Sequence, residues 1–149
     1  MKSLITVIDS VARKAGIKVV APLRGKALGF VLAFKAYQDV ADHPSGIMVV
    51  QPQGYLEFSY LTAHAMGVIT DSGNVAEEAT FNGVPCVTLN SYTEHMETVT
   101  VGTNELVAED PEKLQNAMEK ILNGEWKKAG IPDRWDGRSA ERIVQILAE

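Results

Sequence analysis

Residues Val68 to Thr80 read Val-Ile-Thr-Asp-Ser-Gly-Asn-Val-Ala-Glu-Glu-Ala-Thr, and this stretch decides how the chain folds. An apolar run ends at Asp71, and a helix-forming run begins directly after it. A strand that passes at once into a helix leaves the first N–H groups of that helix without helical partners, here beside the Ser72 hydroxyl. Glu78 follows one turn further on. The stretch therefore indicates a strand-to-helix turn that can hold an anionic group.

The same alternation runs through the whole chain. Short apolar runs predict strands at residues 17–21, 47–50, 68–70, 84–89 and 105–108. Helical spacing predicts helices from residue 4 to a stop at Gly16 and over 26–40, 55–65, 75–81, 111–122 and 139–147, with a turn at 42–46 and a helical turn within 92–98. Helices that alternate with continuously apolar strands are typical of an α/β, Rossmann-like fold, a parallel sheet with helices on both faces.

The chain opens with a helix, although a doubly wound domain normally opens with a strand. We therefore expect the strand that usually lies at the centre of the sheet to be missing. Ligands of such sheets bind beyond the carboxyl ends of the strands. Four polar segments fall at those ends: 22–24, 51–53, 71–73 and 90–91.

Composition limits the class of protein. A length of 149 residues with 46% apolar content predicts one domain, 1–149, with a single core. A net charge of -5 without a basic cluster argues against nucleic-acid binding. The sequence shows neither a membrane-spanning run nor a signal peptide, so we expect a cytoplasmic protein that does not bind membranes. The only cysteine, Cys86, lies in an apolar run and is expected to be a core residue.

We expect neither a metal nor a cofactor. His43 lies in an Asp-His-Pro turn and His64 in a helix, and neither has a cysteine or carboxylate at ligand spacing.

Several motifs resemble non-hydrolysing UDP-N-acetylglucosamine 2-epimerases in their order and spacing. They are Gly54-Tyr55-Leu56-Glu57-Phe58, Thr70-Asp71-Ser72-Gly73 with Glu77-Glu78-Ala79, Gly83-Val84-Pro85-Cys86-Val87, Thr93-Glu94-His95-Met96-Glu97, Gly102-Thr103-Asn104 and the late segment 136–143. The resemblance is specific from about Gln51 onward. It covers the C-terminal half of an enzyme in which two Rossmann-like halves close on a nucleotide sugar, the GT-B arrangement.

The resemblance implies a UDP site. Ser72 and Gly73 would hold the diphosphate, Glu78 the ribose hydroxyls, and Phe58 and the backbone near Gln53 the uracil. Each residue also has a structural alternative: Ser72 as a helix cap, Gly73 as a residue for an unusual backbone angle, Phe58 as core and Gln53 as a turn residue.

Three positions depart from the family pattern. His95 replaces an arginine expected near the phosphates, and an imidazole is mostly neutral at pH 7. We keep His95 as a candidate UDP-binding residue, with loop filling as the alternative. Arg24 stands in a segment where the family has Pro-x-His-Pro, and Asn74 replaces the second glycine of Ser-Gly-Gly.

The family interconverts UDP-GlcNAc and UDP-ManNAc by eliminating UDP and adding it back. The base residues and the His-Arg-x-Glu segment of the family are absent from this sequence, so we expect a UDP-binding fragment that is insufficient for catalysis alone, with UDP or a UDP-N-acetylhexosamine as its ligand. The alternatives are the C-terminal half of a GT-B glycosyltransferase and a non-catalytic Rossmann-like binding or interaction domain. Apolar sheet edges left by a missing strand predict self-association or pairing with an N-terminal half.

Overall fold

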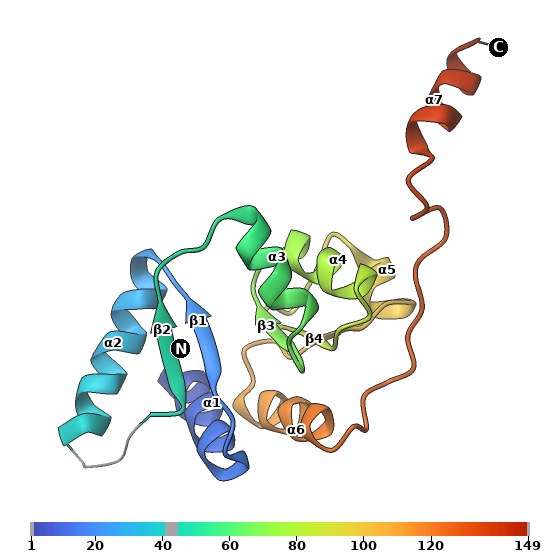
Figure 1. Ribbon diagram of the computed structural model, residues 1–149. Coiled ribbons are helices and arrows are strands. Elements are labelled where there is room, and N and C mark those ends of the chain that lie inside the picture. Colours follow the sequence, from blue (N-terminus) through green and yellow to red (C-terminus); the bar gives the residue numbers. More distant parts are fainter. Residues whose placement is uncertain (1, 41–44, 149) are drawn as a thin grey trace.

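The structure, a computed structural model, describes residues 2–40 and 45–148, without the side chains of 37–40. Helices and strands alternate along the chain (Figure 1). They are α1 (Lys2–Ala15), β1 (Val19–Pro22), α2 (Gly25–Val40), β2 (Ile47–Val50), α3 (Tyr55–Ala63), β3 (Val68–Thr70), α4 (Gly73–Phe81), β4 (Cys86–Thr88), α5 (Met96–Thr100), β5 (Asn104–Leu106), α6 (Pro111–Leu122) and α7 (Ser139–Ala148). The predicted α/β class is confirmed. Most of the predicted turn at 42–46, including His43, lies outside the described residues.

The strands form two separate parallel sheets rather than one. The order is β1-β2 in the first sheet and β3-β4-β5 in the second. A doubly wound sheet has the strand order 3-2-1-4-5-6. Strands β2 and β1 take positions 3 and 2 of this order, and strands β3, β4 and β5 take positions 4, 5 and 6. Position 1, between β1 and β3, receives no strand from the residues that the structure describes. The observed topology agrees with the expectation that the central strand is missing.

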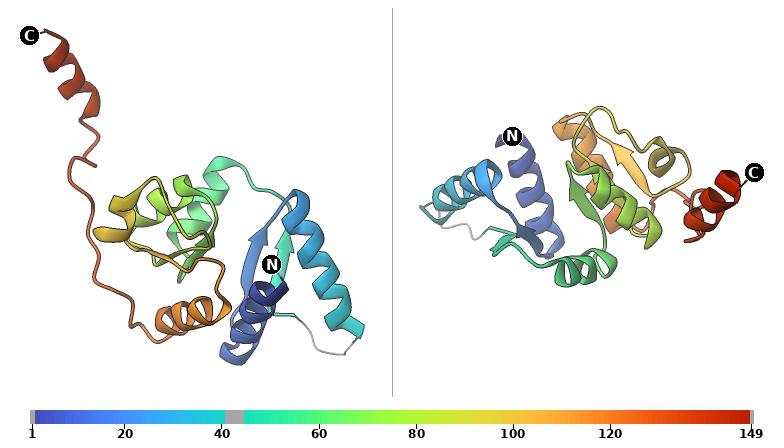
Figure 2. Two further views of the ribbon diagram at one scale, coloured as in Figure 1. Left: turned by 180° about the vertical axis from the view of Figure 1, so that it is seen from behind. Right: turned by 90° about the horizontal axis from the view of Figure 1, so that it is seen from above.

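Helices cover both faces of the strands. In the view from above, α1, α2 and α6 lie on one side and α3 and α4 on the other (Figure 2). One core cluster joins α1 and α6 to the second sheet through Leu4, Val87 and Leu114. A second cluster joins α1 and α2 to the first sheet through Ile5, Val31 and Ile47, while α4 packs on the opposite face through Ala76, Ala79 and Cys86.

Several predicted boundaries are wrong by a few residues. The strand predicted from Ile17 begins at Val19, because the Ile17 N–H donates to the Ala12 carbonyl at 3.0 Å and so closes α1, with Gly16 at φ +66°. The strand predicted over 105–108 ends at Leu106, because Ala108 and Glu109 take φ values of 54° and 56°. The helix predicted from residue 75 begins at Gly73.

Other elements are shorter or displaced. The strand predicted over 84–89 covers only Cys86–Thr88. The Val84 N–H donates instead to the carbonyl of Ala79, in the last turn of α4, at 2.9 Å. The helix predicted over 55–65 ends at Ala63, and the helical turn predicted within 92–98 forms at 96–100.

The last helix stands apart from the rest of the chain. An extended segment leads from α6 to α7, which projects away from the other elements (Figures 1 and 2). The large apolar side chains of α7 are exposed: Ile143, Val144, Ile146 and Leu147. Its start is fixed by Asp136, which accepts bonds of 2.9 and 2.6 Å from the Arg142 guanidinium. Among the described residues, no helix is long and apolar enough to cross a membrane.

Candidate functional site

The turn between β3 and α4 presents unused hydrogen-bond donors. Ser72 is the N-cap of α4 with extended backbone angles, and its own N–H donates to Thr70 Oγ1 at 3.0 Å. Ser72 occupies the N-cap position, but its hydroxyl makes no hydrogen bond to the helix N–H groups. The structural alternative, in which the Ser72 side chain caps the helix, is therefore wrong. The N–H groups of residues 73–75 have no carbonyl within reach inside the helix. Together with the helix dipole, they favour a negatively charged group at this point.

Helix α6 shows the opposite arrangement. The Asp110 carboxylate caps α6 by accepting bonds from the N–H groups of Glu112 and Lys113 at 2.9 and 3.2 Å. The start of α6 is thus satisfied within the protein, whereas the start of α4 keeps its donors and a free hydroxyl.

His95 lies over the start of α4. A methyl group built at Gly73 would meet His95 Cδ2 at 2.8 Å and Nε2 at 3.1 Å, so the ring lies directly on the glycine. On its other side, Nδ1 of His95 lies 3.1 Å from Glu77 Oε1 and 4.0 Å from Glu97 Oε1. The structure thus brings Ser72, Gly73 and His95 together, with Glu77 beside them.

Buried polar groups hold the loop that carries His95. Thr88 Oγ1 donates to Asn104 Oδ1 at 2.8 Å, and Asn104 Nδ2 donates to Thr98 Oγ1 at 3.1 Å. The Thr98 hydroxyl in turn donates to the His95 carbonyl at 2.7 Å. This chain of bonds connects β4 and β5 to the backbone of His95.

The neighbouring Gly102 and Thr103 have packing roles. A methyl group at Gly102 would meet the Thr98 carbonyl oxygen at 2.7 Å and press on Thr80. The Thr103 N–H donates to Thr80 Oγ1 at 3.3 Å, and the Thr103 carbonyl accepts a bond of 2.8 Å from Trp126 Nε1. This bond anchors Trp126, and with it the segment that follows α6, to the start of β5.

Glu77, His95 and Glu97 offer three ligand atoms within 4.8 Å of one another. Two carboxylates and an imidazole at this separation suit a divalent cation in type. The same geometry fits a surface ion pair between a protonated His95 and the two carboxylates. All three side chains are partly exposed. The expectation that the site uses no metal stays a prediction.

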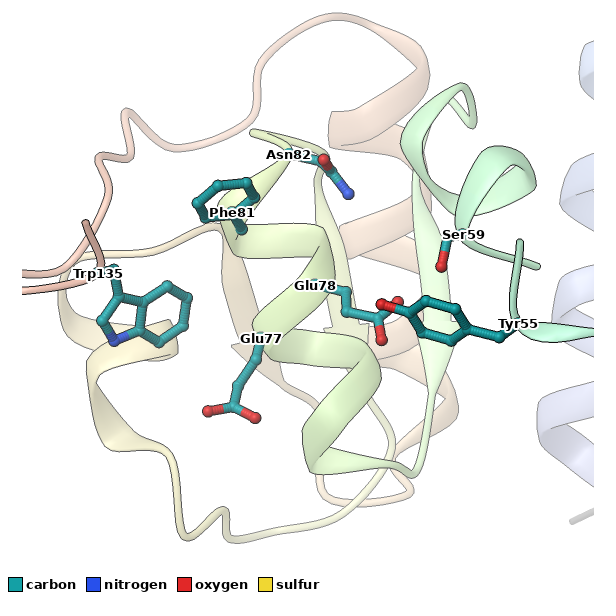
Figure 3. Close-up of a pocket in the computed structure, with 7 residues that line it drawn as sticks. All are labelled: Tyr55, Ser59, Glu77, Glu78, Phe81, Asn82 and Trp135. Carbon is teal, nitrogen blue, oxygen red and sulfur yellow. The ribbon is translucent and has the colours of Figure 1, made fainter. Parts of the chain in front are cut away.

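Glu78 lies one turn into α4, on the side that faces α3. It lines a hollow of about 410 Å³ with Tyr55, Ser59, Glu77, Phe81, Asn82 and Trp135. Figure 3 shows the Glu78 side chain directed toward Tyr55, with Trp135 on the far side of α4 near Glu77. Ser59 Oγ is buried without a hydrogen-bond partner. The hollow combines aromatic surface with the carboxylates of Glu77 and Glu78.

The two residues proposed to contact the uracil ring lie elsewhere: Phe58 on α3 and Gln53 in the segment before it. Gln53 donates from its side-chain amide to the Gln51 carbonyl at 2.5 Å, and it lines a separate hollow with Leu56, Glu57, Tyr60 and Leu61. Phe58 is half-buried on α3. The structure therefore groups Ser72, Gly73 and His95, places Glu78 beside them on α4, and leaves Gln53 and Phe58 apart from this group.

Two residues that the sequence analysis names within motifs, but without a role in the site, also line this region. Tyr55 is 73% exposed and shares the hollow with Glu78, and Glu77 contacts His95. For Glu77 the sequence did hold a signal, because residues 73 and 77 lie on the same side of a helix. Tyr55 could not be placed from sequence, since its position depends on how α3 packs on α4.

Three other titratable residues, Cys86, His64 and Arg24, are not among the residues grouped at the start of α4. Burial raises the pKa of the Cys86 thiol to about 12, which agrees with a core role. His64 stacks on Tyr60 with ring centroids 4.0 Å apart and is exposed. Arg24 is exposed just before α2.

Comparison with known proteins decides the family. The model of the UDP-N-acetylglucosamine 2-epimerase family matches residues 1–148. The chain belongs to this family. It is 48% identical over 102 residues to the UDP-N-acetylglucosamine 2-epimerase of Methanocaldococcus jannaschii, an alignment that covers 68% of this chain and 27% of that protein. It is 34% identical over 149 residues to the enzyme of the same name from Methanococcus maripaludis, covering 99% of this chain and 39% of the other.

A solved structure gives the same result. The chain superposes on the UDP-GlcNAc 2-epimerase of M. jannaschii, crystallised in complex with UDP-GlcNAc and UDP, with a TM-score of 0.77 and 35% identity. The superposition covers 99% of this chain and 40% of the other. The family member described here thus spans about two fifths of these relatives, as expected for one half of a GT-B architecture.

Proposed function

We propose that residues 1–149 form a single UDP-binding domain, the part of a UDP-GlcNAc 2-epimerase that holds UDP or a UDP-N-acetylhexosamine. The observation that carries this proposal is the start of α4, where the Ser72 hydroxyl and the first helical N–H groups are free while His95 lies beside them. A diphosphate carries the negative charge that such a site favours.

The position of Glu78 supports a nucleoside rather than a simple anion. Its carboxylate lies further along the same helix and faces a hollow that includes the Tyr55 and Trp135 rings. A carboxylate can accept two hydrogen bonds from the adjacent hydroxyls of a ribose. The M. jannaschii relative was crystallised with UDP-GlcNAc and UDP, which supports the same ligand class for this chain.

We also propose that the chain alone does not epimerise. Its contribution is electrostatic: donors already in place stabilise the charge that develops on the diphosphate when the sugar bond breaks. Proton transfer at the sugar needs a base on the other side of the substrate. The chain covers 40% of the solved relative, and we propose that this base belongs to the remaining part of the enzyme.

Calorimetric titration with UDP tests the binding proposal. We expect binding by the wild-type chain and about tenfold weaker binding by Ser72→Ala and by Glu78→Gln, because each change removes a hydrogen bond to a charged group. Matched controls are Ser3→Ala on α1 and Glu112→Gln on α6, which lie at other helices and should leave the affinity unchanged. Absence of binding at millimolar UDP would reject the proposal, and equal affinities for all four variants would place UDP elsewhere.

A coupled assay for UDP-GlcNAc epimerisation tests the second part. We expect no turnover from this chain alone, whether EDTA is present or absent. Turnover would show that the chain carries its own base.

A further inference from the structure

We infer that Glu77 is a positioning residue for His95. It holds a proton on Nδ1 of the imidazole, so that Nε2 must take up a second proton before it can donate to a diphosphate at the start of α4. Binding of the nucleotide sugar is then coupled to the uptake of a proton from solution. The inference rests on the proposed function and deepens it, since it states how the start of α4 holds the diphosphate.

Nδ1 of His95 faces a carboxylate. It lies 3.1 Å from Glu77 Oε1, which is a hydrogen-bond distance. The same nitrogen is 4.0 Å from Glu97 Oε1, which is too far for a hydrogen bond. An ionised carboxylate only accepts hydrogen bonds, so Nδ1 is the donor and carries the proton.

Nε2 lies on the other edge of the ring, toward the end of α4 that favours an anion. A methyl group built on Gly73, the first residue of α4, would stand 3.1 Å from Nε2. The Cα–Cβ bonds of a helix tilt toward its N-terminus, and the first N–H groups point the same way. Nε2 therefore lies on the side of Gly73 where the proposed diphosphate would bind.

The protonation of Nε2 decides whether it attracts this ligand. When Nδ1 carries the single proton of a neutral ring, Nε2 presents a lone pair. Phosphate oxygens are negatively charged acceptors, so they form no hydrogen bond with a lone pair. A second proton makes Nε2 a charged donor, and hydrogen bonds of this kind are the strong ones. A histidine can take up this proton near neutral pH, because its ordinary pKa is about 6.5.

The charges around the ring favour the same coupling. Within the described ranges, the carboxylates that come within 4.0 Å of a ring nitrogen are Glu77 on α4 and Glu97 on α5. Asp71 and Glu94, the other carboxylates of the two neighbouring turns, are exposed. Two carboxylates beside a neutral ring repel a diphosphate, whereas a protonated ring offsets one of these charges.

The backbone of His95 is fixed on both sides of the ring. Its N–H donates to Thr93 Oγ1 at 3.1 Å, and its carbonyl accepts a bond of 2.7 Å from the Thr98 hydroxyl. The ring can therefore keep its place between Glu77 and the start of α4.

Glu77 is not engaged in the role proposed for Glu78. Figure 3 shows the two side chains leaving α4 in different directions. The side chains of His95 and Glu77 are 29% and 34% exposed, so both a ligand and a proton from solution reach them.

Calorimetric titration of the full chain with UDP-GlcNAc, in HEPES and in Tris with EDTA present, tests the inference. Both phosphates of UDP-GlcNAc are esterified, whereas a terminal phosphate such as that of UDP itself takes up a proton near pH 6. The two buffers release protons with different enthalpies, so the difference in heat counts the protons bound. We expect uptake of at least about half a proton at pH 7.5, and about fivefold tighter binding at pH 6.5 than at pH 8.

Two variants separate positioning from packing. Glu77→Ala lets the neutral ring carry its proton on Nε2, so we expect binding with uptake below about a quarter of a proton. His95→Arg carries a fixed charge and should bind without proton uptake. The matched control, Glu112→Ala in the first turn of α6, should keep the wild-type uptake. An unchanged proton count in Glu77→Ala would overturn the inference, whatever happens to the affinity.

Nitrogen-15 NMR of the His95 ring gives a readout that needs no ligand. At pH 8 we expect the proton on Nδ1 in the wild-type chain and on Nε2 in Glu77→Ala. A wild-type ring with its proton on Nε2 contradicts the inference. Binding of UDP-GlcNAc without proton uptake overturns the inference alone, whereas no binding at any pH up to millimolar ligand overturns the proposed function together with it.

Discussion

The imidazole of His95 lies directly against the backbone of Gly73, so that a single methyl group at residue 73 would stand 2.8 Å from Cδ2. Distances below about 3.0 Å are not sustained between such atoms, and the ring is the part that can move. The close approach therefore connects the identity of residue 73 to the position of residue 95.

Replacement of Gly73 tests this connection. We expect Gly73→Ala to displace His95 from the start of α4 and to weaken UDP binding about tenfold, because one group that borders the diphosphate is lost and a methyl group enters the site. Calorimetry and the NMR shifts of the His95 ring would measure the two effects.

Gly29→Ala is the matched control. Gly29 lies in α2, and a methyl group there would meet no atom within 4 Å. UDP affinity should not change. An unaltered His95 environment in Gly73→Ala would contradict the prediction.

Loss of the Asn104 side chain should strongly destabilise the chain. Asn104 is fully buried, and Asn104→Ala removes the partner of the Thr88 hydroxyl and one partner of the Thr98 hydroxyl. Buried polar groups without partners cost about 2–4 kcal/mol in all. Urea unfolding measures the effect, and Asn116→Ala on the exposed side of α6 is the same substitution as a control.

The thiol of Cys86 should be inert in the folded chain. Its pKa of about 12 leaves roughly one part in ten thousand as thiolate at pH 8, and the side chain is fully buried. We expect Ellman's reagent to react on the timescale of unfolding and immediately in concentrated guanidinium chloride. Rapid reaction of the native chain would show that β4 opens locally.

The start of α7 should depend on pH through Asp136. The Arg142 guanidinium holds the pKa of the Asp136 carboxyl well below its usual range. Because the folded value is the lower one, the stabilisation is complete above the ordinary aspartate pKa of about 3.9 and is lost as the pH falls through the folded value. NMR shifts of residues 139–142 during acid titration would follow this change.

Two variants complete the pH experiment. Asp136→Asn should fray the first turn of α7 already at neutral pH, whereas Asp133→Asn, at an exposed carboxylate three residues earlier, should not. Fraying that begins well above the ordinary aspartate pKa would contradict the assignment to Asp136.

The sequence predicts most elements because their signals are local. Gly16 ends α1 as expected, and the helix predicted over 111–122 forms with Asp110 as its cap, since both effects depend on neighbours within a few residues. The boundary errors also have local causes, such as the bond from Ile17 back to Ala12, which the apolar pattern alone does not reveal.

The site is less predictable because its groups come from distant parts of the chain. Nothing near Asn104 indicates that it would bond to Thr88, and nothing near Tyr55 indicates that it would share a hollow with Glu78. Ser72 shows the limit most clearly. Its residue type predicts a cap, yet its hydroxyl makes no capping bond.

The separation of the strands into two sheets has a consequence for how the molecule unfolds. No described backbone hydrogen bond joins β1 to β3, so the sheet β1-β2 and the sheet β3-β4-β5 are held together by side-chain packing. Helix α1 is the element whose residues belong to the core clusters of both sheets. We therefore expect cooperativity between the two sheets to depend chiefly on α1. The pair β1-β2 with α2 can loosen as a unit while the half that carries Ser72 and His95 keeps its shape.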